Sequence, residues 1–190
     1  MSLEFKGKSI LVERVSRAVG GDCPESITDN LRNVLCDLIH DERVRLPDCV
    51  FQHHPDHYSR RLIHQDPELG YTIMAMTWGP GQSTPVHDHD GMWCVEAVWS
   101  GQIEVVQYEL IEHSDNRYRL ERRTTMRTGV GSAGSLIPPH EYHTIANVDP
   151  GRAAVTVHIY AGEMDHCCVF EPRQGDWYER QDRRLSLDVA

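Results

Sequence analysis

The stretch that decides the fold is GQSTPVHDHDGMWCVEAVWSG, which runs from Gly81 to Gly101. At its centre are His87 and His89, which stand one residue apart just after a proline. Side chains of an extended chain alternate between its two faces, so both imidazoles are expected to point the same way. A third histidine, His143, lies in the downstream segment PPHEYHTIAN. The spacing predicts an open metal site built from three histidine nitrogens.

Taken alone, a His-x-His pair is equally typical of two polar residues on a solvated strand face, so the metal site must be supported by its context. The composition supplies part of that context. The 190 residues carry 19 Lys and Arg against 29 Asp and Glu, for a net charge of -10. Such a charge makes nucleic acid and anionic membrane surfaces poor partners. No apolar run reaches the length of a membrane span, and residues 1–20 lack a signal-peptide core.

The length suits one domain with a hydrophobic core, and we expect residues 1–190 to form a single, monomeric domain. The six cysteines show no C-x-x-C spacing and too low a density for a small secreted scaffold. We therefore expect a reducing, cytoplasmic environment without structural disulfides.

The hydrophobic period changes along the chain. Residues 1–50 form a helical part, with a helix over about 10–19 that ends at Gly20-Gly21 and a second that starts near Ser26, the expected N-cap. Residues 58–173 read as short strands rich in Val, Ile, Thr, Tyr and Trp between turn clusters. This pattern predicts an all-β-dominated jelly-roll barrel with N-terminal helices. The predicted strands are 60–65, 71–79, 93–100, 102–110, 118–124, 134–137, 143–148, 153–161 and 166–171.

The residues around the histidines resemble the two motifs of the cupin superfamily. Gly81 stands six residues before His87, and Gly101 follows Cys94 by seven. Further on, Pro138 precedes His143 by five and Asn147 follows it by four. The chain departs from these motifs at three positions, with Cys94 in place of a metal-binding Glu and with Ser132 and His140 in place of two glycines.

The exchange of Glu for Cys94 changes the expected chemistry. Two histidines and one carboxylate are the usual non-haem iron(II) set, and three neutral histidines leave one more positive charge on the metal. Such a centre favours anionic, soft ligands such as a thiolate. Cys94 itself is either a fourth ligand or a small buried hydrophobic residue.

From Tyr58 to Arg173 the chain resembles the thiol dioxygenases, and most closely the cysteine dioxygenase family. The resemblance implies that His87, His89 and His143 bind iron(II). It also implies that Arg60, in the run Tyr58-Ser59-Arg60-Arg61-Leu62, holds the substrate carboxylate with Tyr58 beside it. The family's thioether crosslink falls on Cys94 and Tyr160. Its hydroxyl, imidazole and phenol series falls on Thr156, His158 and Tyr160, with Tyr160, His158 and Cys94 as catalytic residues and Thr156 in the substrate pocket.

The residues support these roles by their pattern. Thr156, His158 and Tyr160 alternate with Val157 and Ile159, so a strand presents the three polar groups on one face. Buried polar groups need partners, and these three supply them to one another. The alternatives are that His158 is an ordinary core histidine and that Arg60 is a surface charge. The guanidinium of an Arg suits a bidentate carboxylate.

The expected activity is therefore oxidation of free L-cysteine by O2 to cysteine sulfinic acid, with Fe(2+) as cofactor. Three alternatives stay open: oxidation of another mercapto acid such as 3-mercaptopropionate, a cupin enzyme that acts on a non-thiol substrate, and a non-enzymatic metal-binding cupin module. A second metal site at His53, His54 and His57 is also conceivable, although short histidine tracts in polar loops are usually solvated.

Overall fold

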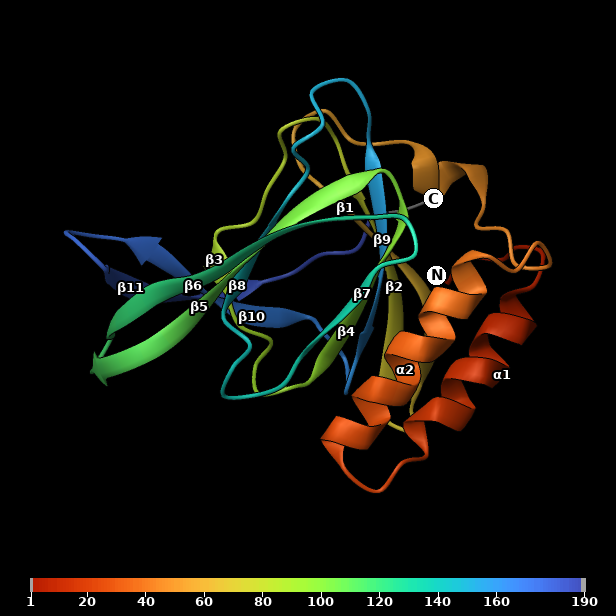
Figure 1. The fold of residues 1–190 in the computed structure, drawn as a ribbon, viewed down its shortest axis with the longest axis horizontal. Coiled ribbons are helices and arrows are strands. Elements are labelled where there is room, and N and C mark those ends of the chain that lie inside the picture. Colours follow the sequence, from red (N-terminus) through yellow and green to blue (C-terminus); the bar gives the residue numbers. More distant parts are fainter. Residues whose placement is uncertain (1, 189–190) are drawn as a thin grey trace.

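The computed structural model describes residues 2–188, which form two N-terminal helices and two β-sheets (Figure 1). Helices α1 and α2 span Lys8–Val19 and Pro24–Ile39, and a short 3-10 helix spans Asp48–Phe51. The strands are β1 Ser59–Asp66, β2 Tyr71–Trp78, β3 Val86–His87, β4 Cys94–Ser100, β5 Gln102–Ser114, β6 Arg117–Gly129, β7 Ala133–Leu136, β8 His143–Ala146, β9 Ala154–Tyr160, β10 His166–Pro172 and β11 Trp177–Arg184.

The strands form two antiparallel sheets that enclose the core. The first sheet has the order β1-β2-β9-β4-β7. The second has the order β10-β11-β6-β5-β8-β3 and closes on itself because β3 pairs with β10. Neighbours in both sheets are often distant in sequence, as in a jelly roll. The predicted fold class, an all-β-dominated barrel of the cupin type with N-terminal helices, is confirmed.

The helices cover the outer face of the first sheet (Figure 1). Leu31, Leu35 and Leu38 recur at helix spacing on α2, and all three are fully buried. They belong to one hydrophobic cluster with Val157 of β9 and Val95 of β4. The apolar stripe that marked α2 in the sequence is therefore the surface that packs against the sheet.

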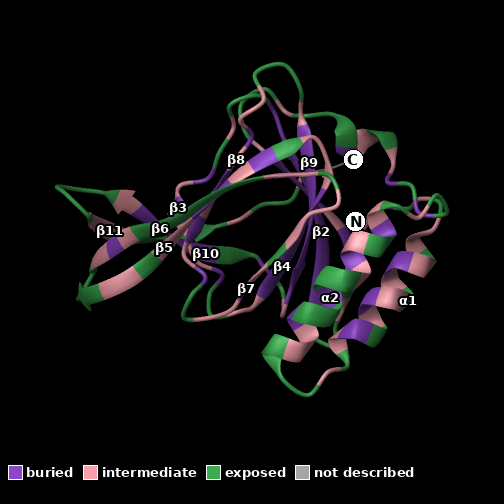
Figure 2. Ribbon diagram, viewed as in Figure 1, coloured by how far each residue is buried: buried purple, intermediate pink, exposed green. Residues whose placement is uncertain are grey.

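Strands β2 and β9 are buried along their whole length, because the helices cover one face and the barrel interior lies on the other (Figure 2). On β9, Val155, Val157 and Ile159 belong to the cluster beneath the helices. The alternate residues, among them His158 and Tyr160, are buried on the opposite face. Polar groups on this strand therefore lie inside the protein, where each needs a partner.

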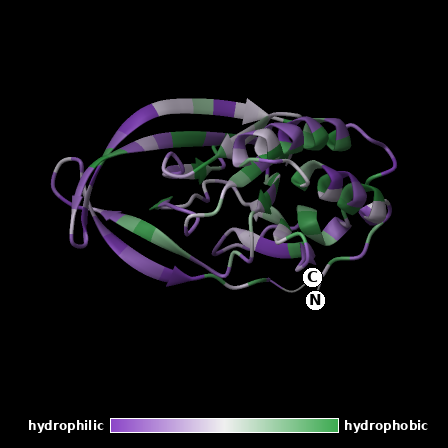
Figure 3. Cartoon of the chain, turned by 90° about the horizontal axis from the view of Figure 1, so that it is seen from below, coloured by the Kyte–Doolittle hydropathy of each residue, from purple (hydrophilic) through white to green (hydrophobic). Residues whose placement is uncertain are grey.

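The hairpin of β5 and β6 extends away from the helices (Figure 1). Its far end is exposed, and the strands that lie farthest from the helices are mainly hydrophilic (Figure 3). Ion pairs such as Arg127 with Glu104, at 3.0 Å, link the two strands on the surface. Exposed ion pairs of this kind contribute little to stability, so the hairpin is stabilised mainly by the packing of its inner half.

One local expectation was wrong. Helix α2 begins at Pro24 with Cys23 as its N-cap, and Ser26 is the third residue after this cap, where its hydroxyl donates a 3.0 Å hydrogen bond to the Cys23 carbonyl oxygen. Pro24 suits a first helical position because the missing N–H has no partner there in any helix. Two strands were not among those predicted. These are β3, which is only two residues long, and β11, which lies between β10 and β6.

Among residues 2–188, none of the helices combines the length and the apolar character that crossing a bilayer requires.

Candidate metal centre

Three histidines from two neighbouring segments converge in the barrel. His87 on β3 lies directly opposite His143 on β8 in the sheet register. His89 follows two residues after His87, beyond the end of β3. One nitrogen from each ring lies within 4.8 Å of the others. The predicted three-histidine group is therefore present, and its geometry fits a single metal ion.

The backbone sets the orientation of two of these rings. The Nδ1 atoms of His143 and His87 lie 2.7 Å and 3.2 Å from the carbonyl oxygens of Glu141 and Pro85. A carbonyl accepts only, so each Nδ1 carries the proton and donates it. The Nε2 atoms are then lone-pair donors, which is the tautomer that a metal ligand needs.

Two nitrogen atoms of the group have no protein partner in the described chain. These are Nε2 of His143 and Nδ1 of His89, and both are buried. A buried polar atom without a partner costs about 1–3 kcal/mol. A divalent metal ion would satisfy both atoms, so the residues present fit the metal that this type of fold implies.

Burial keeps the three rings neutral. It lowers the pKa of His87, and it lowers the pKa values of His89 and His143 well below the ordinary value. For His89 and His143 the neighbouring histidines add to the effect by mutual repulsion. Neutral imidazole is the form that coordinates metals, so the site is prepared for a cation before one binds.

Asp88, between the two histidines, fixes the course of this segment. Its carboxylate accepts a 2.8 Å hydrogen bond from the backbone N–H of Cys168, and its own N–H donates to the Cys168 carbonyl oxygen at 3.1 Å. Since β3 ends at His87, strand alternation alone does not place His89. The anchor on β10 keeps the chain extended for one more residue and turns His89 inward.

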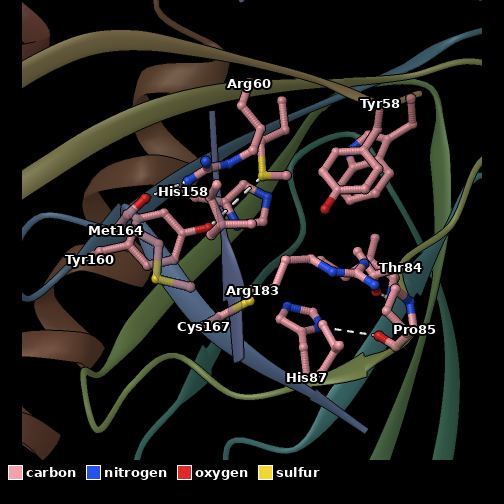
Figure 4. Close-up of a pocket in the computed structure, with 15 residues that line it drawn as sticks. Tyr58, Arg60, Thr84, Pro85, His87, His158, Tyr160, Met164, Cys167 and Arg183 are labelled. Atoms are coloured by element: carbon pink, nitrogen blue, oxygen red, sulfur yellow. Dashed lines mark hydrogen bonds between the residues drawn. The ribbon is translucent and has the colours of Figure 1, made fainter. Parts of the chain in front are cut away.

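A cavity opens beside His87 and is lined by Arg60, Tyr58, His158 and Tyr160 (Figure 4). The Arg60 guanidinium donates to the backbone carbonyl oxygens of Met164, at 2.7 Å, and Ser186, at 3.2 Å. Arg60 is only 5 % exposed, so it is not the surface charge that the sequence left open. Tyr58 stacks on Trp78 with ring centroids 4.7 Å apart.

The polar series on β9 forms one hydrogen-bonded chain. The indole N–H of Trp78 donates to Thr156 Oγ1 at 2.9 Å, and Thr156 Oγ1 lies 2.7 Å from His158 Nε2. An indole N–H only donates, so Trp78 uses one acceptor position of the Thr156 hydroxyl, and that hydroxyl and His158 Nε2 share the next hydrogen bond. His158 Nδ1 lies 3.2 Å from the Tyr160 oxygen, so the hydrogen-bonded series continues to the phenol.

Cys94 and Tyr160 lie side by side in this structure. They are direct register partners on β4 and β9, and both side chains are buried. Burial raises the pKa of the Cys94 thiol well above its ordinary value, and the charge of Glu96 adds to this effect. The Cys94 sulfur is not among the converging metal-ligating atoms, so the structure does not place Cys94 as a fourth ligand.

Two residues of the site were not found from the sequence. Glu96, two residues after Cys94, is buried with one carboxyl oxygen 3.9 Å from His143 Nε2 and 3.6 Å from His158 Nδ1. Alternation along β4 from Cys94 was the signal that would have found it. Arg183 lies in the same cavity as His87 (Figure 4), and it was missed because β11 was not predicted. His53, His54 and His57 do not form a metal group in residues 2–188.

The fold and the three-histidine group define a cupin protein. Residues 50–173, more than half of the chain, match the family described as cysteine dioxygenase type I, and the chain therefore belongs to that family. Cysteine dioxygenase type 1 of Rattus norvegicus is 24% identical over 118 residues, and that of Homo sapiens is 22% identical over 126 residues. Each match covers 62% of this chain and 58% of the relative, so the chain spans less than two thirds of those proteins.

Solved structures show weaker likenesses. The crystal structure of TT1209 from Thermus thermophilus has a TM-score of 0.48 at 17% identity and covers 63% of this chain and 96% of that one. A cupin 2 conserved barrel domain protein from Rhodopseudomonas palustris has a TM-score of 0.46 at 16% identity, with coverages of 66% and 75%. At these scores the architecture is established by the strand order and register above.

Proposed function

We propose that this chain is an iron(II)-dependent dioxygenase that oxidises free L-cysteine with O2 to cysteine sulfinate. The observation that carries the proposal is the convergence of three neutral imidazoles beside a cavity that also holds the buried Arg60. The net reaction converts a thiol and O2 into a sulfinate and one proton, so it needs no further reductant.

The proposed metal ligands are His87, His89 and His143. Iron(II) bound there would supply the redox chemistry that delivers both oxygen atoms of O2 to sulfur. The protein contributes a buried, neutral donor set, which leaves the net positive charge of the ion to attract an anionic thiolate. Cysteine would approach this set with its thiolate and its amino group.

Arg60 is proposed to hold the substrate carboxylate. A guanidinium has five N–H donors, and the two hydrogen bonds to backbone carbonyls leave others free. Those carbonyls also fix the direction of the side chain, so little rotamer entropy is lost when an anion binds. Tyr58 closes the same side of the cavity by stacking on Trp78.

The series Thr156, His158 and Tyr160 is proposed to position the phenol. The hydrogen bond between His158 Nδ1 and the Tyr160 oxygen holds the phenol beside the cavity. The series is anchored at the indole N–H of Trp78, which donates to Thr156. A phenol held in place in this way needs little reorganisation when the reaction occurs.

We also propose that Cys94 and Tyr160 form a thioether bond. Their pairing across β4 and β9 supports this. The bond would join the Cys94 sulfur to a ring carbon of Tyr160, with loss of the thiol hydrogen and one ring hydrogen, and O2 would accept the two electrons.

Two broader expectations are carried forward as proposals. Residues 1–190 are proposed to act as one domain, since α1, α2 and the first sheet share a single buried cluster. A cytoplasmic location is proposed because all six cysteines, which lie within residues 2–188, are free thiols.

The test is oxygen consumption by the iron(II)-loaded full chain with free cysteine, with mass spectrometry to identify the sulfinate. We expect one O2 consumed per sulfinate, and a loss of activity of at least a hundredfold in His143→Ala, because the metal loses a ligand. The same assay with 3-mercaptopropionate distinguishes the nearest alternative. Oxidation of 3-mercaptopropionate but not of cysteine would assign that alternative, and no oxidation of either thiol would overturn the proposal.

A further inference from the structure

Glu96 is a buried carboxyl group that the proposed reaction has not yet used. It lies on β4 opposite His158, on the strand face that it shares with Cys94, and is 6 % exposed. One of its oxygens, Oε2, has no hydrogen-bond partner within residues 2–188. Leaving a buried acceptor unsatisfied costs about 1–3 kcal/mol, so an unpartnered oxygen near His143 and His158 indicates a missing donor.

The neighbours of Glu96 do not supply that donor. His143 Nε2, at 3.9 Å, has no proton because the ring donates its Nδ1 proton to a backbone carbonyl. His158 Nδ1 is 3.6 Å away, beyond hydrogen-bond range, and is paired with the Tyr160 oxygen at 3.2 Å. Burial raises the pKa of Glu96 to about 8, as expected for a carboxyl group without a basic partner.

The position of Glu96 relative to the three histidines limits its role. It does not belong to the set of donor atoms that lie within 4.8 Å of one another, so it is not a fourth metal ligand in this arrangement. Its Oε2 lies 3.9 Å from Nε2 of His143, so it borders the space beside the proposed metal ligands where a substrate group would bind.

The proposed substrate offers one group of the right kind. A thiolate has no proton to donate, and the carboxylate of the substrate has Arg60 as its proposed partner. An amino group has N–H donors, which a carboxyl oxygen can accept. We propose that Glu96 accepts a hydrogen bond from the amino group of the substrate, and that it thereby selects amino thiols over thiols that lack nitrogen. This inference rests on the proposed thiol dioxygenase function and specifies its substrate class.

The test compares ligands that differ by one group. The iron(II)-loaded full chain is titrated by calorimetry in the absence of O2 with cysteine, with cysteamine, which lacks the carboxylate, and with 3-mercaptopropionate, which lacks the amine. In Glu96→Met, which removes the acceptor but keeps the side-chain length, we expect the Kd of cysteine and of cysteamine to rise about tenfold. The Kd of 3-mercaptopropionate should stay within about twofold of wild type, which also shows that the variant is folded and loaded. Glu96→Gln, which keeps an acceptor oxygen but loses the charge, should fall between wild type and Glu96→Met.

Glu104→Gln provides the matched control, because Glu104 is a carboxylate on β5, the next strand along the chain, and is paired with Arg127 at the surface. All three affinities should be unchanged there. An equal loss for the three thiols, or no loss in either Glu96 variant, would overturn the role of Glu96 and leave the proposed function intact. If wild type binds none of the three thiols, the proposed function falls, and the role of Glu96 falls with it.

Discussion

Arg60 is held by two backbone carbonyl oxygens that come from separate segments near the end of the chain, at Met164 and Ser186. Neither carbonyl neutralises the guanidinium charge. Within residues 2–188 the side chain is therefore oriented but has no anionic partner, which is the state expected of a group that binds a carboxylate.

We expect Arg60→Ala to weaken the use of cysteine much more than that of cysteamine. Loss of a charged hydrogen-bonding partner costs about 1.5–3 kcal/mol, which corresponds to roughly a ten- to hundredfold rise in KM for cysteine. Steady-state oxygen consumption with both thiols measures this difference. Because cysteamine has no carboxylate, its KM should change little, and equal losses for both thiols would remove Arg60 from the proposed role.

The proposed bond between Cys94 and Tyr160 has a direct signature in the mass of the intact protein. We expect part of the purified chain to be lighter by two hydrogens, with the modified residues on peptides that contain positions 94 and 160. Cys94→Ala should show only the unmodified mass. The assignment fails if the variant shows the same deficit, since the sulfur that forms the bond is then absent.

At the scale of single residues, the sequence predicted the site well where the motif was local. His87 and His89 were identified by their spacing, whereas the series Thr156, His158 and Tyr160 is anchored by Trp78, a residue on another strand. Glu96 was not predicted as a site residue because the cupin motif has its carboxylate at the position of Cys94. In the structure a carboxyl group lies two residues after Cys94 on the same face of β4, outside the group of proposed metal ligands.

Among the elements, α2 shows most clearly how packing against the sheet sets stability. Leu35 is fully buried in the cluster between α2 and the first sheet. We expect Leu35→Ala to lower the free energy of unfolding by about 2–5 kcal/mol, because it removes apolar contacts and leaves a cavity. Denaturant titration of the metal-free protein measures this change. Asn33→Ala, at an exposed position of the same helix, should stay within about 0.5 kcal/mol of wild type, and similar losses for both would contradict this account.

Helices and strands were predictable where their hydrophobic periodicity extends over enough residues to be recognised. The apolar stripe of α2 and the alternation of β9 each extend over several residues, and the start of α2 and both ends of β9 were predicted within about two residues. Strand β3 is too short to show a period, and its course depends on Asp88 binding the backbone of Cys168. Strand β11 is polar and mostly exposed toward its end, so it lacks the alternation that identifies a strand.

For the molecule as a whole, the buried histidines make stability depend on pH. Burial is the main cause that lowers the pKa of His158 to about 3, with the charges of His87 and Arg60 adding to it. An unfolded histidine has an ordinary pKa of 6.5, so below that pH the unfolded state binds more protons than the folded state. The stabilising contribution is therefore complete above pH 6.5 and is lost as the pH falls toward 3. His87, His89 and His143 act with the same sign.

Glu96 acts with the opposite sign. Because burial raises its pKa from 4.5 to about 8, the folded state keeps this proton over that window, and stability is lost as the pH rises through it. Because four histidines act against one carboxyl group, the loss of stability at acidic pH is the larger effect. We expect the metal-stripped protein to lose unfolding free energy between pH 6.5 and pH 5, by up to about 1.4 kcal/mol per pH unit for each histidine. Chemical denaturation at several pH values measures the slope, which should be shallower in His158→Gln. A flat profile would contradict the burial of these rings in neutral form.

The direct pairing of His87 with His143 ties ion capture to the assembly of the sheet. The two residues are 56 positions apart in the sequence and meet through a single pair between β3 and β8. A slip of one position would turn one ring to the outside, so a misaligned chain has at most two of its three donors in place. Uptake of a divalent ion during refolding would thus report correct strand alignment rather than mere collapse, and a colorimetric chelator could follow it in real time.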